Sequence, residues 1–506
     1  MQGRPLPIRC SIVAKLLIAG FALLALSWVF LNPPGAGPDE AANYIKAVAV
    51  GQGDLLGARN GPPPTQAIVT ITTNALRADW ANSTTRWLRV PGSLAPAGFT
   101  VGDATSPRQP SYVGTYQPFM YLLPGLATRL APDPITAVIL ARLVTALICL
   151  GLLGTAAWLL WMPGRAGLPL TGLVLAITPL VVFLSAVVSA SGFEICAGLC
   201  TFAAVIRIAR PQTPTRAVFL ALAVAGVVLA LSRPLGVIWL GLDLALLVIL
   251  TRPRRLLTIV NTAGRPPRVA ALALAAAASL GVAWELAVDP HHHTTVAEIL
   301  YYLPRAIALL PLDLKQGIGI FGWLDTWMPA GAYVLWSATM AALLVVALVV
   351  GTRRQRLLLG LLALTTLGVA LVVGAVIIMP IGGSALQARY FLAFAVTVPL
   401  YAGEVIARNA HRLRRFRPAQ LVGSVIAVAA VLQGIGLVVN RISFSGDLPD
   451  YARVFSPGGV WSPPVRASLW LALGLGGCLL LLAAGAAAFR KPTGRPATAA
   501  TTSVAA

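Results

Sequence analysis

Long apolar runs recur along almost the whole chain, and they restrict it to a membrane. A helix needs roughly 20 mostly apolar residues to cross a bilayer, and about twelve segments meet that requirement. Hydrophobic residues make up 58% of the 506 residues, and charged residues only 11%. We place the spans at 12–31, 136–160, 168–188, 191–209, 216–232, 234–251, 268–288, 329–350, 357–379, 388–407, 419–440 and 466–489. The sequence therefore predicts an all-α, polytopic membrane protein with about 12 transmembrane helices.

The first run has some features of a secretory signal, but its apolar region continues to Leu31. Asn32-Pro33-Pro34 follows it, without the small residues of a cleavage site. We interpret this run as a retained helix.

Basic residues predict which way the helices run. Lysine and arginine near a span resist translocation, so the short loops that carry them stay on the cytoplasmic side. The N-terminal segment, every second connection and the tail are basic, at Arg4–Lys15, Arg207–Arg216, Arg252–Arg268, Arg353–Arg356, Arg408–Arg417 and Arg490–Arg495. We therefore expect a protein of the cytoplasmic membrane with both termini in the cytoplasm.

The formal net charge of +22 has the same explanation. Anionic headgroups attract basic connections, so membrane lipids are the expected partners of this charge and nucleic acid is not. Apart from Asp243 and Glu404, which lie deep in apolar spans, the acidic residues fall on outer segments or outer helix ends. Any reaction that uses a carboxylate is therefore expected on the outer side of the membrane.

The five cysteines lie in or beside spans and indicate no disulfide framework.

The connections complete the expected organisation. Residues 1–31 form the cytoplasmic N-terminus and first helix, 32–135 the first extracytoplasmic loop, 136–288 helices two to seven, 289–328 a second outer loop, 329–489 the last helices with the outer loop 441–465, and 490–506 a disordered cytoplasmic tail. In the first loop, PDEAANYIKAVAVGQG predicts an amphipathic helix that ends at a glycine. This loop lacks a core of its own and should pack on the bundle. TTVAEILYYLPRAIALLP predicts a helix along the membrane surface, broken at Pro304.

Asp39 and Glu40 are adjacent carboxylates just after the first span. One interpretation is helix capping, in which Asp accepts backbone N–H groups and Glu in the first turn complements the dipole. The other is a general base or metal ligand that a rigid Pro-Gly turn holds at the membrane surface. The sequence leaves both open.

Two arginines are candidates for phosphate binding. QARYF places Gln387, Arg389 and Tyr390 at the outer start of the tenth span, and LSRPLG places Arg233 between two closely spaced helices. An arginine at this depth is costly unless it is paired or near the interface. Arg389 either extends to lipid headgroups or binds a lipid phosphate through its planar guanidinium group. A phosphate site would use both arginines.

Aromatic motifs border the outer surface. GIGIFGWLDTWMP contains Trp323 and Asp325, and YQPFMY begins and ends with Tyr116 and Tyr121. Interfacial anchoring explains such aromatic residues. A surface on which sugar rings stack is the competing explanation, and the sequence does not separate the two.

Other polar residues give weaker signals. The tract His291–His293 has the composition of a metal site, but adjacent loop side chains rarely converge on one ion. Glu194, in SASGFE, and the deeper Asp243 are candidates because intramembrane carboxylates are often functional. A buried hydrogen bond between helices explains them equally well. A divalent metal ion stays open as a cofactor, with no ligand set assigned.

Taken in order, these motifs resemble a family of bacterial membrane proteins, the domain-of-unknown-function family 2142, which looks related to the GT-C glycosyltransferases. The landmarks are PDEAAN, YQPFMY, SASGFE, LSRPLG, GIGIFGWLDTWMP and LQARYF, and they cover most of residues 30–410. Two positions depart from the family's pattern. Asn43 stands where a histidine is usual, and Glu194 where an aspartate is usual.

The resemblance implies a GT-C-like fold and a function. GT-C enzymes move a sugar from a polyprenyl-phosphate donor onto an acceptor outside the cytoplasmic membrane, with an acidic residue of the first outer loop beside the reaction centre. By this resemblance, Asp39 would be the base, and Glu40 its neighbour or an acceptor contact. An arginine would stabilise the departing lipid phosphate. The acceptor would be an envelope glycan or lipid.

Two other classes remain open. A bundle of about twelve helices also suits a transporter or flippase of a lipid-linked saccharide, although transporters often have two similar halves and the halves here look unlike. The other class is a non-catalytic envelope assembly protein.

No phosphate-binding glycine loop occurs in the sequence, so nucleotide hydrolysis has no support.

Overall fold

The computed structural model describes residues 12–59, 67–70, 108–111, 113–165, 167–288, 295–378, 387–413, 417–443 and 463–488. The histidine tract 291–293, the centre of the outer loop 441–465 and the tail 490–506 fall outside the described residues. The predictions for these segments therefore stay predictions.

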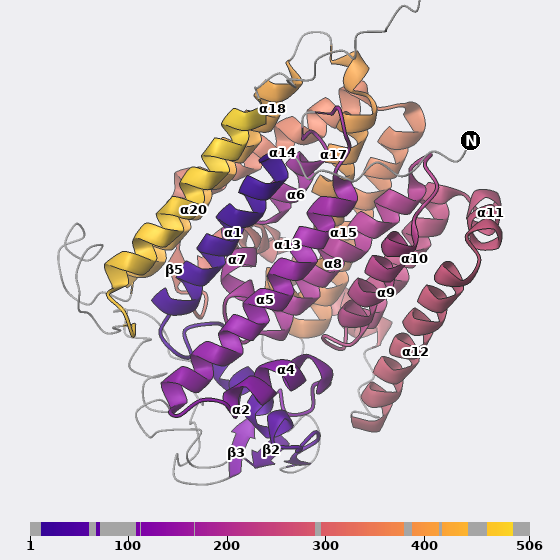
Figure 1. Cartoon of the computed structure of the whole chain (residues 1–506). Coiled ribbons are helices and arrows are strands. Elements are labelled where there is room, and N and C mark those ends of the chain that lie inside the picture. Colours follow the sequence, from indigo (N-terminus) through magenta and orange to yellow (C-terminus); the bar gives the residue numbers. More distant parts are fainter. Residues whose placement is uncertain are drawn as a thin grey trace, which may run out of the picture.

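Helices dominate the described residues and pack into one bundle (Figure 1). Eight of them are long and apolar enough to cross a bilayer, which confirms the polytopic helical fold. A ninth candidate is the bent pair α10 (Gly236–Thr251) and α11 (Pro253–Ala263), whose axes differ by 97°. The eight are α1 (Ile12–Leu31), α5 (Pro134–Leu160), α8 (Ala190–Ala209), α12 (Arg265–Val288), α14 (Ala330–Val350), α15 (Arg353–Ile378), α18 (Pro418–Ser443) and α20 (Ala467–Ala488).

The expected number of spans, about twelve, is higher than this count. All of the expected segments are helical, but some are short or broken. The segment 168–188 divides into α6 (Leu170–Ala176) and α7 (Pro179–Ser185), because the proline keeps Thr178 before it extended. α9 (Arg216–Ala230) has 15 residues and α10 has 16, so each is shorter than a full span.

The expected tenth span is also broken. It divides into η3 (Ala388–Tyr390), α16 (Leu392–Ala395) and α17 (Thr397–Arg408), and η4 (Ala410–Arg412) follows. Hydropathy alone does not separate such broken segments from a continuous helix. The break matters for function because it brings Arg389 out of a regular helix.

The described parts of residues 32–135, the segment predicted to lie outside the membrane, form a cap at one end of the bundle, at the bottom of Figure 1. This outer cap contains α2 (Glu40–Gly51), α4 (Phe119–Thr128) and the antiparallel strands β1 (Ala58–Arg59), β2 (Ala67–Thr70) and β3 (Arg108–Ser111), in the order β1-β2-β3. α2 ends at a glycine as predicted, and all of its residues are buried, its polar side chains included. Its apolar side chains form one cluster with residues of α4, α5 and α8, so the outer cap is fixed to the bundle.

α1 and α20 pack side by side along one edge of the bundle (Figure 1). Glycines allow the close approach, since a Cβ atom on Gly477 would lie 2.7 Å from the carbonyl oxygen of Gly20. Phe30 stacks on Trp470, with 3.8 Å between ring centroids. This packing fixes the end of α1, from which the chain enters the acidic motif.

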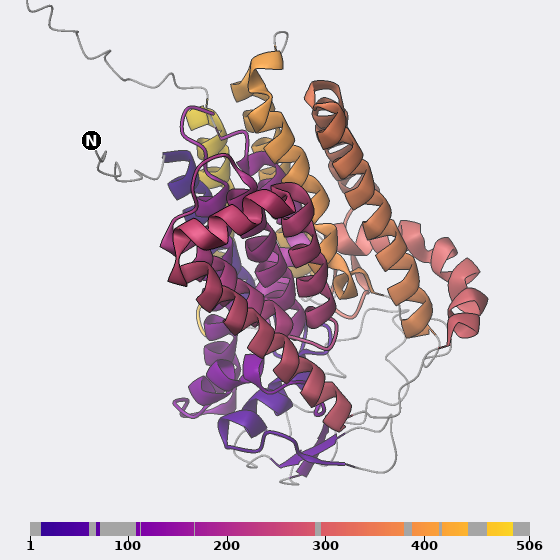
Figure 2. The same ribbon diagram turned by 90° about the vertical axis from the view of Figure 1, so that its right-hand side faces the viewer.

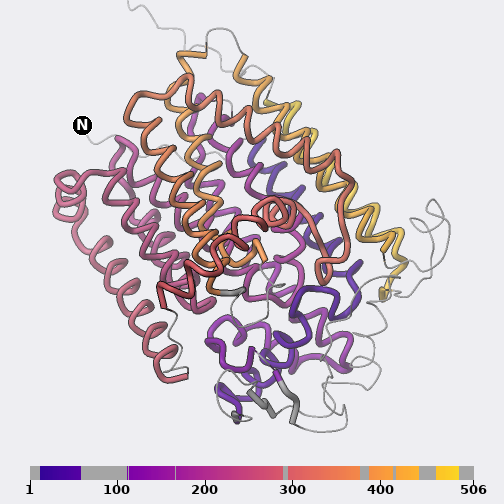
Figure 3. The backbone as a smooth tube through the Cα atoms, turned by 180° about the vertical axis from the view of Figure 1, so that it is seen from behind, coloured from indigo at the N-terminus to yellow at the C-terminus, as the bar shows by residue number. Residues whose placement is uncertain are grey.

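α13 (Val296–Gly319) runs across the direction of α15 (Figures 2 and 3). It begins at a capping box made by Thr295 and Glu298 and continues through Pro304 and Pro311, so the predicted break at Pro304 is wrong. Packing against α15 holds the helix together where the prolines remove backbone hydrogen bonds. A hairpin of β4 (Ile320–Phe321) and β5 (Thr326–Trp327) follows, and it carries the GWLD motif to the outer cap.

Candidate functional site

Segments far apart in the sequence meet where the outer cap joins the bundle. Asp39, Arg389, Tyr390, Arg233 and Tyr116 lie together there. They come from the turn after α1, from η3, from the turn between α9 and α10, and from the loop before α4. We call these five residues the junction site.

Asp39 precedes α2 in a left-handed backbone conformation, with φ of 60°. Aspartate adopts this conformation more readily than most residues. Its side chain makes no capping hydrogen bond, so the capping interpretation of Asp39 is wrong. The carboxylate instead pairs with the guanidinium group of Arg389. The Asp39 side chain is 21% exposed and is therefore the member of the pair that a solute can reach.

Arg389 is enclosed by protein, with 4% of its side chain exposed, rather than extended to lipid headgroups. Nη1 donates to the carbonyl oxygen of Pro38 at 3.1 Å, and Nη2 donates to Asp39. The buried Nε has no hydrogen-bond partner among the described residues. A buried donor without a partner costs free energy. A bound acceptor, such as a phosphate oxygen, would remove that cost.

Arg233 approaches the same tyrosine ring as Arg389. Its guanidinium carbon lies 4.7 Å from the ring centroid of Tyr390, and that of Arg389 lies 5.3 Å from it. Arg233 also lies 5.7 Å from the ring centroid of Tyr116. Both arginines are buried. The two cations that the sequence proposed for one phosphate site thus share one location.

Glu194, in α8, is fully buried and faces Arg233. Its Oε1 accepts a hydrogen bond from Trp239 Nε1 at 3.1 Å, and its Oε2 lies 3.6 Å from Arg233 Nη1. Arg233 Nη1 also donates to Ser191 Oγ at 3.0 Å. Glu194 therefore supports Arg233 from inside the bundle. Sequence analysis missed Trp239 and Ser191, which are ordinary residues of apolar helices.

Glu40 points away from Asp39, into the bundle. Arg142 binds it with two hydrogen bonds, Nε to Oε1 and Nη2 to Oε2, each 2.6 Å long. Backbone N–H groups of Gly35, Gly37 and Val188 donate to the same carboxylate. Its side chain is 0% exposed. These donors occupy both oxygens and leave Glu40 no acceptor for a solute.

Arg142, in α5, was not among the predicted site residues. It also donates to the carbonyl oxygens of Val29, Asn32 and Pro33, and so holds the end of α1 and the turn that follows. We call this ion pair and its backbone bonds the Glu40–Arg142 clamp. A signal was present in the sequence, because an arginine within an apolar span needs a partner.

Tyr121 and Asn43 support the backbone of Asp39. The Tyr121 hydroxyl donates to Asn43 Oδ1 at 2.6 Å, and Asn43 Nδ2 donates to the carbonyl oxygen of Asp39 at 2.7 Å. The Tyr121 ring is 2% exposed, so it offers no surface for a sugar to stack on. Tyr116 is half-buried and remains within reach of a ligand at Arg233.

Lys46, in α2, holds the loop that carries Tyr116. Its Nζ donates to the carbonyl oxygens of Leu55 and Gly114, each at 2.6 Å. Burial lowers the pKa of Lys46 to about 8. Because this folded pKa lies below the unfolded value of 10.5, the contribution of Lys46 to stability becomes more favourable as the pH rises from about 8 to 10.5.

The GWLD hairpin borders the turn before Asp39. Trp323 Nε1 donates to the carbonyl oxygen of Gly35 at 3.3 Å. Asp325 Oδ1 accepts a hydrogen bond from the backbone N–H of Trp323 at 3.2 Å and so closes the hairpin. Burial raises the pKa of Asp325. Gln387 Oε1 is buried and lacks a hydrogen-bond partner in the described part of the chain. Trp323 and Gln387 thus lie near the junction site, and Asp325 shapes the hairpin.

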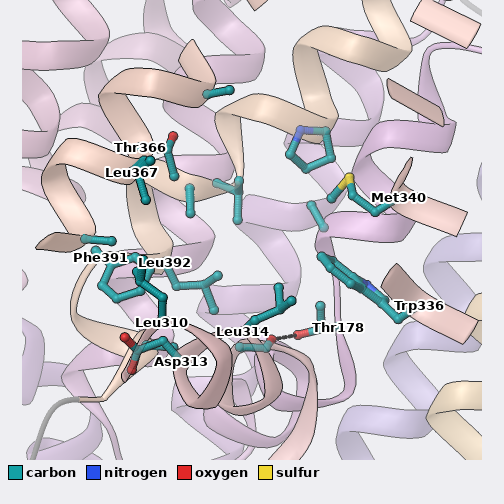
Figure 4. A pocket seen from close by; sticks show the side chains of 18 residues that line it. Thr178, Leu310, Asp313, Leu314, Trp336, Met340, Thr366, Leu367, Phe391 and Leu392 are labelled. Atoms are coloured by element: carbon teal, nitrogen blue, oxygen red, sulfur yellow. Dashed lines mark hydrogen bonds between the residues drawn. The ribbon is translucent and has the colours of Figure 1, made fainter. Parts of the chain in front are cut away.

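An apolar cavity of about 280 Å³ adjoins η3 and α16 (Figure 4). Ala388 and Phe391, which flank Arg389 and Tyr390 in the sequence, line it together with residues of α13, α14 and α15. In Figure 4 the carboxyl group of Asp313 lies at the edge of this cavity. Space suited to hydrocarbon therefore lies next to the segment that carries a guanidinium group.

The described residues offer a divalent ion no ligand set. No three histidine, cysteine, aspartate or glutamate side chains gather around one point in them. At the junction site, Asp39 lies against Arg389, and nearby Glu194 lies against Arg233. Each of the two arginines is thus paired with one carboxylate, and Arg389 keeps a buried Nε donor without a partner among the described residues.

Comparison with protein families classifies the chain. The model of the predicted membrane protein family DUF2142 matches residues 21–398. The chain belongs to the DUF2142 family. The match includes the whole junction site and confirms the resemblance drawn from the order of the motifs. No curated protein sequence matches this DUF2142 chain.

Crystal structures of ArnT from Cupriavidus metallidurans are distantly similar to this DUF2142 protein. The structure bound to undecaprenyl phosphate has a TM-score of 0.43 at 14% identity, and the apo structure has 0.39 at 16%. Each comparison covers 94% of this chain and 76% of the ArnT chain. This similarity is too distant to assign a role to any residue.

Proposed function

We propose that this protein is a GT-C-like membrane glycosyltransferase, which moves a sugar from a polyprenyl-phosphate donor to an envelope glycan or lipid acceptor. The observation that carries the proposal is the junction site, where the accessible carboxylate of Asp39 lies against the buried Arg389 and the buried Arg233 approaches the same tyrosine ring as Arg389. A base for the acceptor and cations for the leaving phosphate are the groups that such a transfer requires.

In the proposed reaction, an acceptor hydroxyl attacks the anomeric carbon of the donor sugar. The bond from that carbon to the phosphate oxygen breaks, and polyprenyl phosphate leaves with the electron pair. Asp39 takes the hydroxyl proton. Arg389 and Arg233 stabilise the charge on the departing phosphate. When Arg389 turns to the phosphate, its hold on Asp39 weakens and the carboxylate is free to accept the proton.

The apolar cavity beside η3 supports a lipid donor. Ala388 and Phe391 line it, and they are neighbours of Arg389 and Tyr390 in the sequence. The phosphate would bind at the arginines and the nearest isoprene units in the cavity. Glu40 takes the role of a positioning residue in this proposal, because the clamp fixes the turn that carries Asp39.

Replacement of the two arginines tests the phosphate site. In Arg389→Gln and Arg233→Gln, the affinity of the purified protein for polyprenyl phosphate in nanodiscs should fall about tenfold or more, because charge-assisted contacts to phosphate are strong. Arg129→Gln is the matched control, since Arg129 is an exposed arginine of the outer cap. Unchanged affinity in both junction-site variants would contradict the proposed phosphate site.

The orientation is part of the proposal. In this proposal the junction site lies on the outer face of the cytoplasmic membrane and both termini lie inside, because the described basic residues near Arg210, Arg354 and Arg408 lie at the opposite end of the bundle. Reporter fusions at Gly92, Asp289 and Asp450 should report outside, and fusions near Arg255 and Arg414 inside. A clear reversal at one of these positions would contradict this topology.

A further inference from the structure

The end of the bundle opposite the outer cap contains a polar pocket. It lies where α8 and α10 end and where α15 begins, far from the outer cap in Figure 1. Its volume is about 150 Å³, and its polar lining includes Arg354, Arg408, Gln355, Tyr401 and Glu404. α8 has 20 residues and is therefore about 30 Å long. Because α8 links the two ends, this pocket is separate from the junction site.

Positive charge exceeds negative charge at this pocket. Glu404 is buried and accepts from Arg210 Nε at 3.0 Å, from Arg210 Nη2 at 2.8 Å and from Arg408 Nε at 2.8 Å. One arginine is enough to balance its charge. Arg354 and Arg255 add further cations, which donate to the C-terminal carbonyls of α10 and α8.

These arginines retain donors for a ligand. Arg354 Nη2 bonds the carbonyl oxygen of Ile249 at 2.7 Å, and Arg408 Nη2 bonds that of Ala209 at 3.2 Å. A guanidinium group has five N–H donors, so these bonds occupy only part of each side chain. α15 also begins beside the pocket, and the N-terminus of a helix attracts anions.

Apolar surface continues from the pocket along α10 and α15. Leu250 and Leu358 line the pocket. Ile249, Leu357 and Leu361 on the same two helices are 40%, 67% and 44% exposed. α11 leaves α10 at 97°, so the chain turns here from crossing the bundle to lying across its end. A helix that lies across the end of a membrane-spanning bundle is expected at the depth of the lipid headgroups.

We propose that this pocket binds the phosphate group of an anionic phospholipid, whose acyl chains lie on the exposed surface of α10 and α15. Planar guanidinium groups bind phosphate oxygens through charge-assisted hydrogen bonds. The combination of a cationic pocket and adjoining apolar helices fits a phospholipid better than it fits free phosphate. The site does not depend on the proposed transfer reaction.

Titration of the purified, delipidated full chain tests the proposal. A short-chain phosphatidylglycerol should raise the unfolding temperature, and phosphatidylcholine and inorganic phosphate at the same concentration should raise it much less. Arg354→Gln should lower the apparent affinity for phosphatidylglycerol about tenfold, because it removes a charge-assisted contact. Arg353→Gln makes the same charge change in the same helical turn, outside the pocket lining, and should leave the affinity unchanged.

Two results would overturn the assignment. Equal weakening in Arg353→Gln and Arg354→Gln would assign the effect to diffuse surface charge. Equal stabilisation by inorganic phosphate would assign the pocket to free phosphate. If Arg354→Gln fails to fold, Tyr401→Phe replaces it as the test variant, because it keeps the aromatic ring and removes only the hydroxyl group. It should weaken phosphatidylglycerol binding about threefold, since it removes one uncharged donor, and an unchanged affinity there would count against the site.

Discussion

Asp39→Asn is expected to lower sugar transfer roughly 10²-fold or more, the scale on which a positioned general base contributes. The amide cannot take a proton from the acceptor hydroxyl. It keeps the size of the side chain and an oxygen that can accept from Arg389. Asparagine also tolerates the positive φ at this position. Folding should therefore survive the change. The measurement is the initial rate of transfer by purified protein with a polyprenyl-phosphate sugar donor.

Thermal unfolding of the same Asp39→Asn sample is the control. The unfolding temperature should stay close to that of the wild type, so that lost activity reports on chemistry. Nearly full transfer activity in this variant would remove Asp39 as the base. Transport of a lipid-linked saccharide would then become the leading account.

Glu40→Gln is expected to lower the stability of the protein, whereas Asp39→Asn lowers its activity. The carboxylate of Glu40 is a structural group. Removing one partner of a buried ion pair leaves the other charge unpaired, which costs about 3–5 kcal/mol. Arg142 would be left buried among carbonyl oxygens with no counter-charge. We expect a low yield of folded protein and a clearly reduced unfolding temperature in detergent. Of the two adjacent carboxylates, replacement of Asp39 should therefore reduce activity and leave stability nearly unchanged, and replacement of Glu40 should reduce stability.

A double-mutant cycle tests the clamp directly. Arg142→Met should destabilise the protein about as much as Glu40→Gln. Each change leaves one buried charge without its partner, Glu40 in the first variant and Arg142 in the second. The pair of changes together should cost less than the sum of the single changes, since neither charge is then left alone. Additive losses would mean that the two side chains do not act as a unit.

The sequence predicted the helical segments well because hydropathy reports directly on burial in a bilayer. It overestimated the number of full spans where local chemistry interrupts a run. Thr178-Pro179 divides one apolar segment, and the QARYF motif lies in a short 3-10 turn before a broken helix. Apolar composition is the same on either side of such breaks. Only the packing of neighbouring helices determines whether the chain continues straight.

The candidate site was predicted in part. The depth of Arg389 and Arg233 predicted one shared location, and the family resemblance added Asp39; in the structure both arginines lie near the ring of Tyr390, and Asp39 pairs with Arg389. The sequence could not separate Asp39 from Glu40, because the direction of each carboxylate depends on a positive φ at Asp39. Arg142 was missed because its partner lies 102 residues away in the chain. Its position inside an apolar span was the available clue.

The central claim is that the protein transfers a sugar to an envelope acceptor. Mass spectrometry of lipid-linked and envelope glycans tests it most directly, in a strain that lacks the protein and carries the wild type, Asp39→Asn or an empty vector. We predict that one sugar is missing from an envelope glycan or lipid with the empty vector and with Asp39→Asn, and that the wild type restores it. Identical glycans in all three strains, or full restoration by Asp39→Asn at normal protein level, would contradict the account.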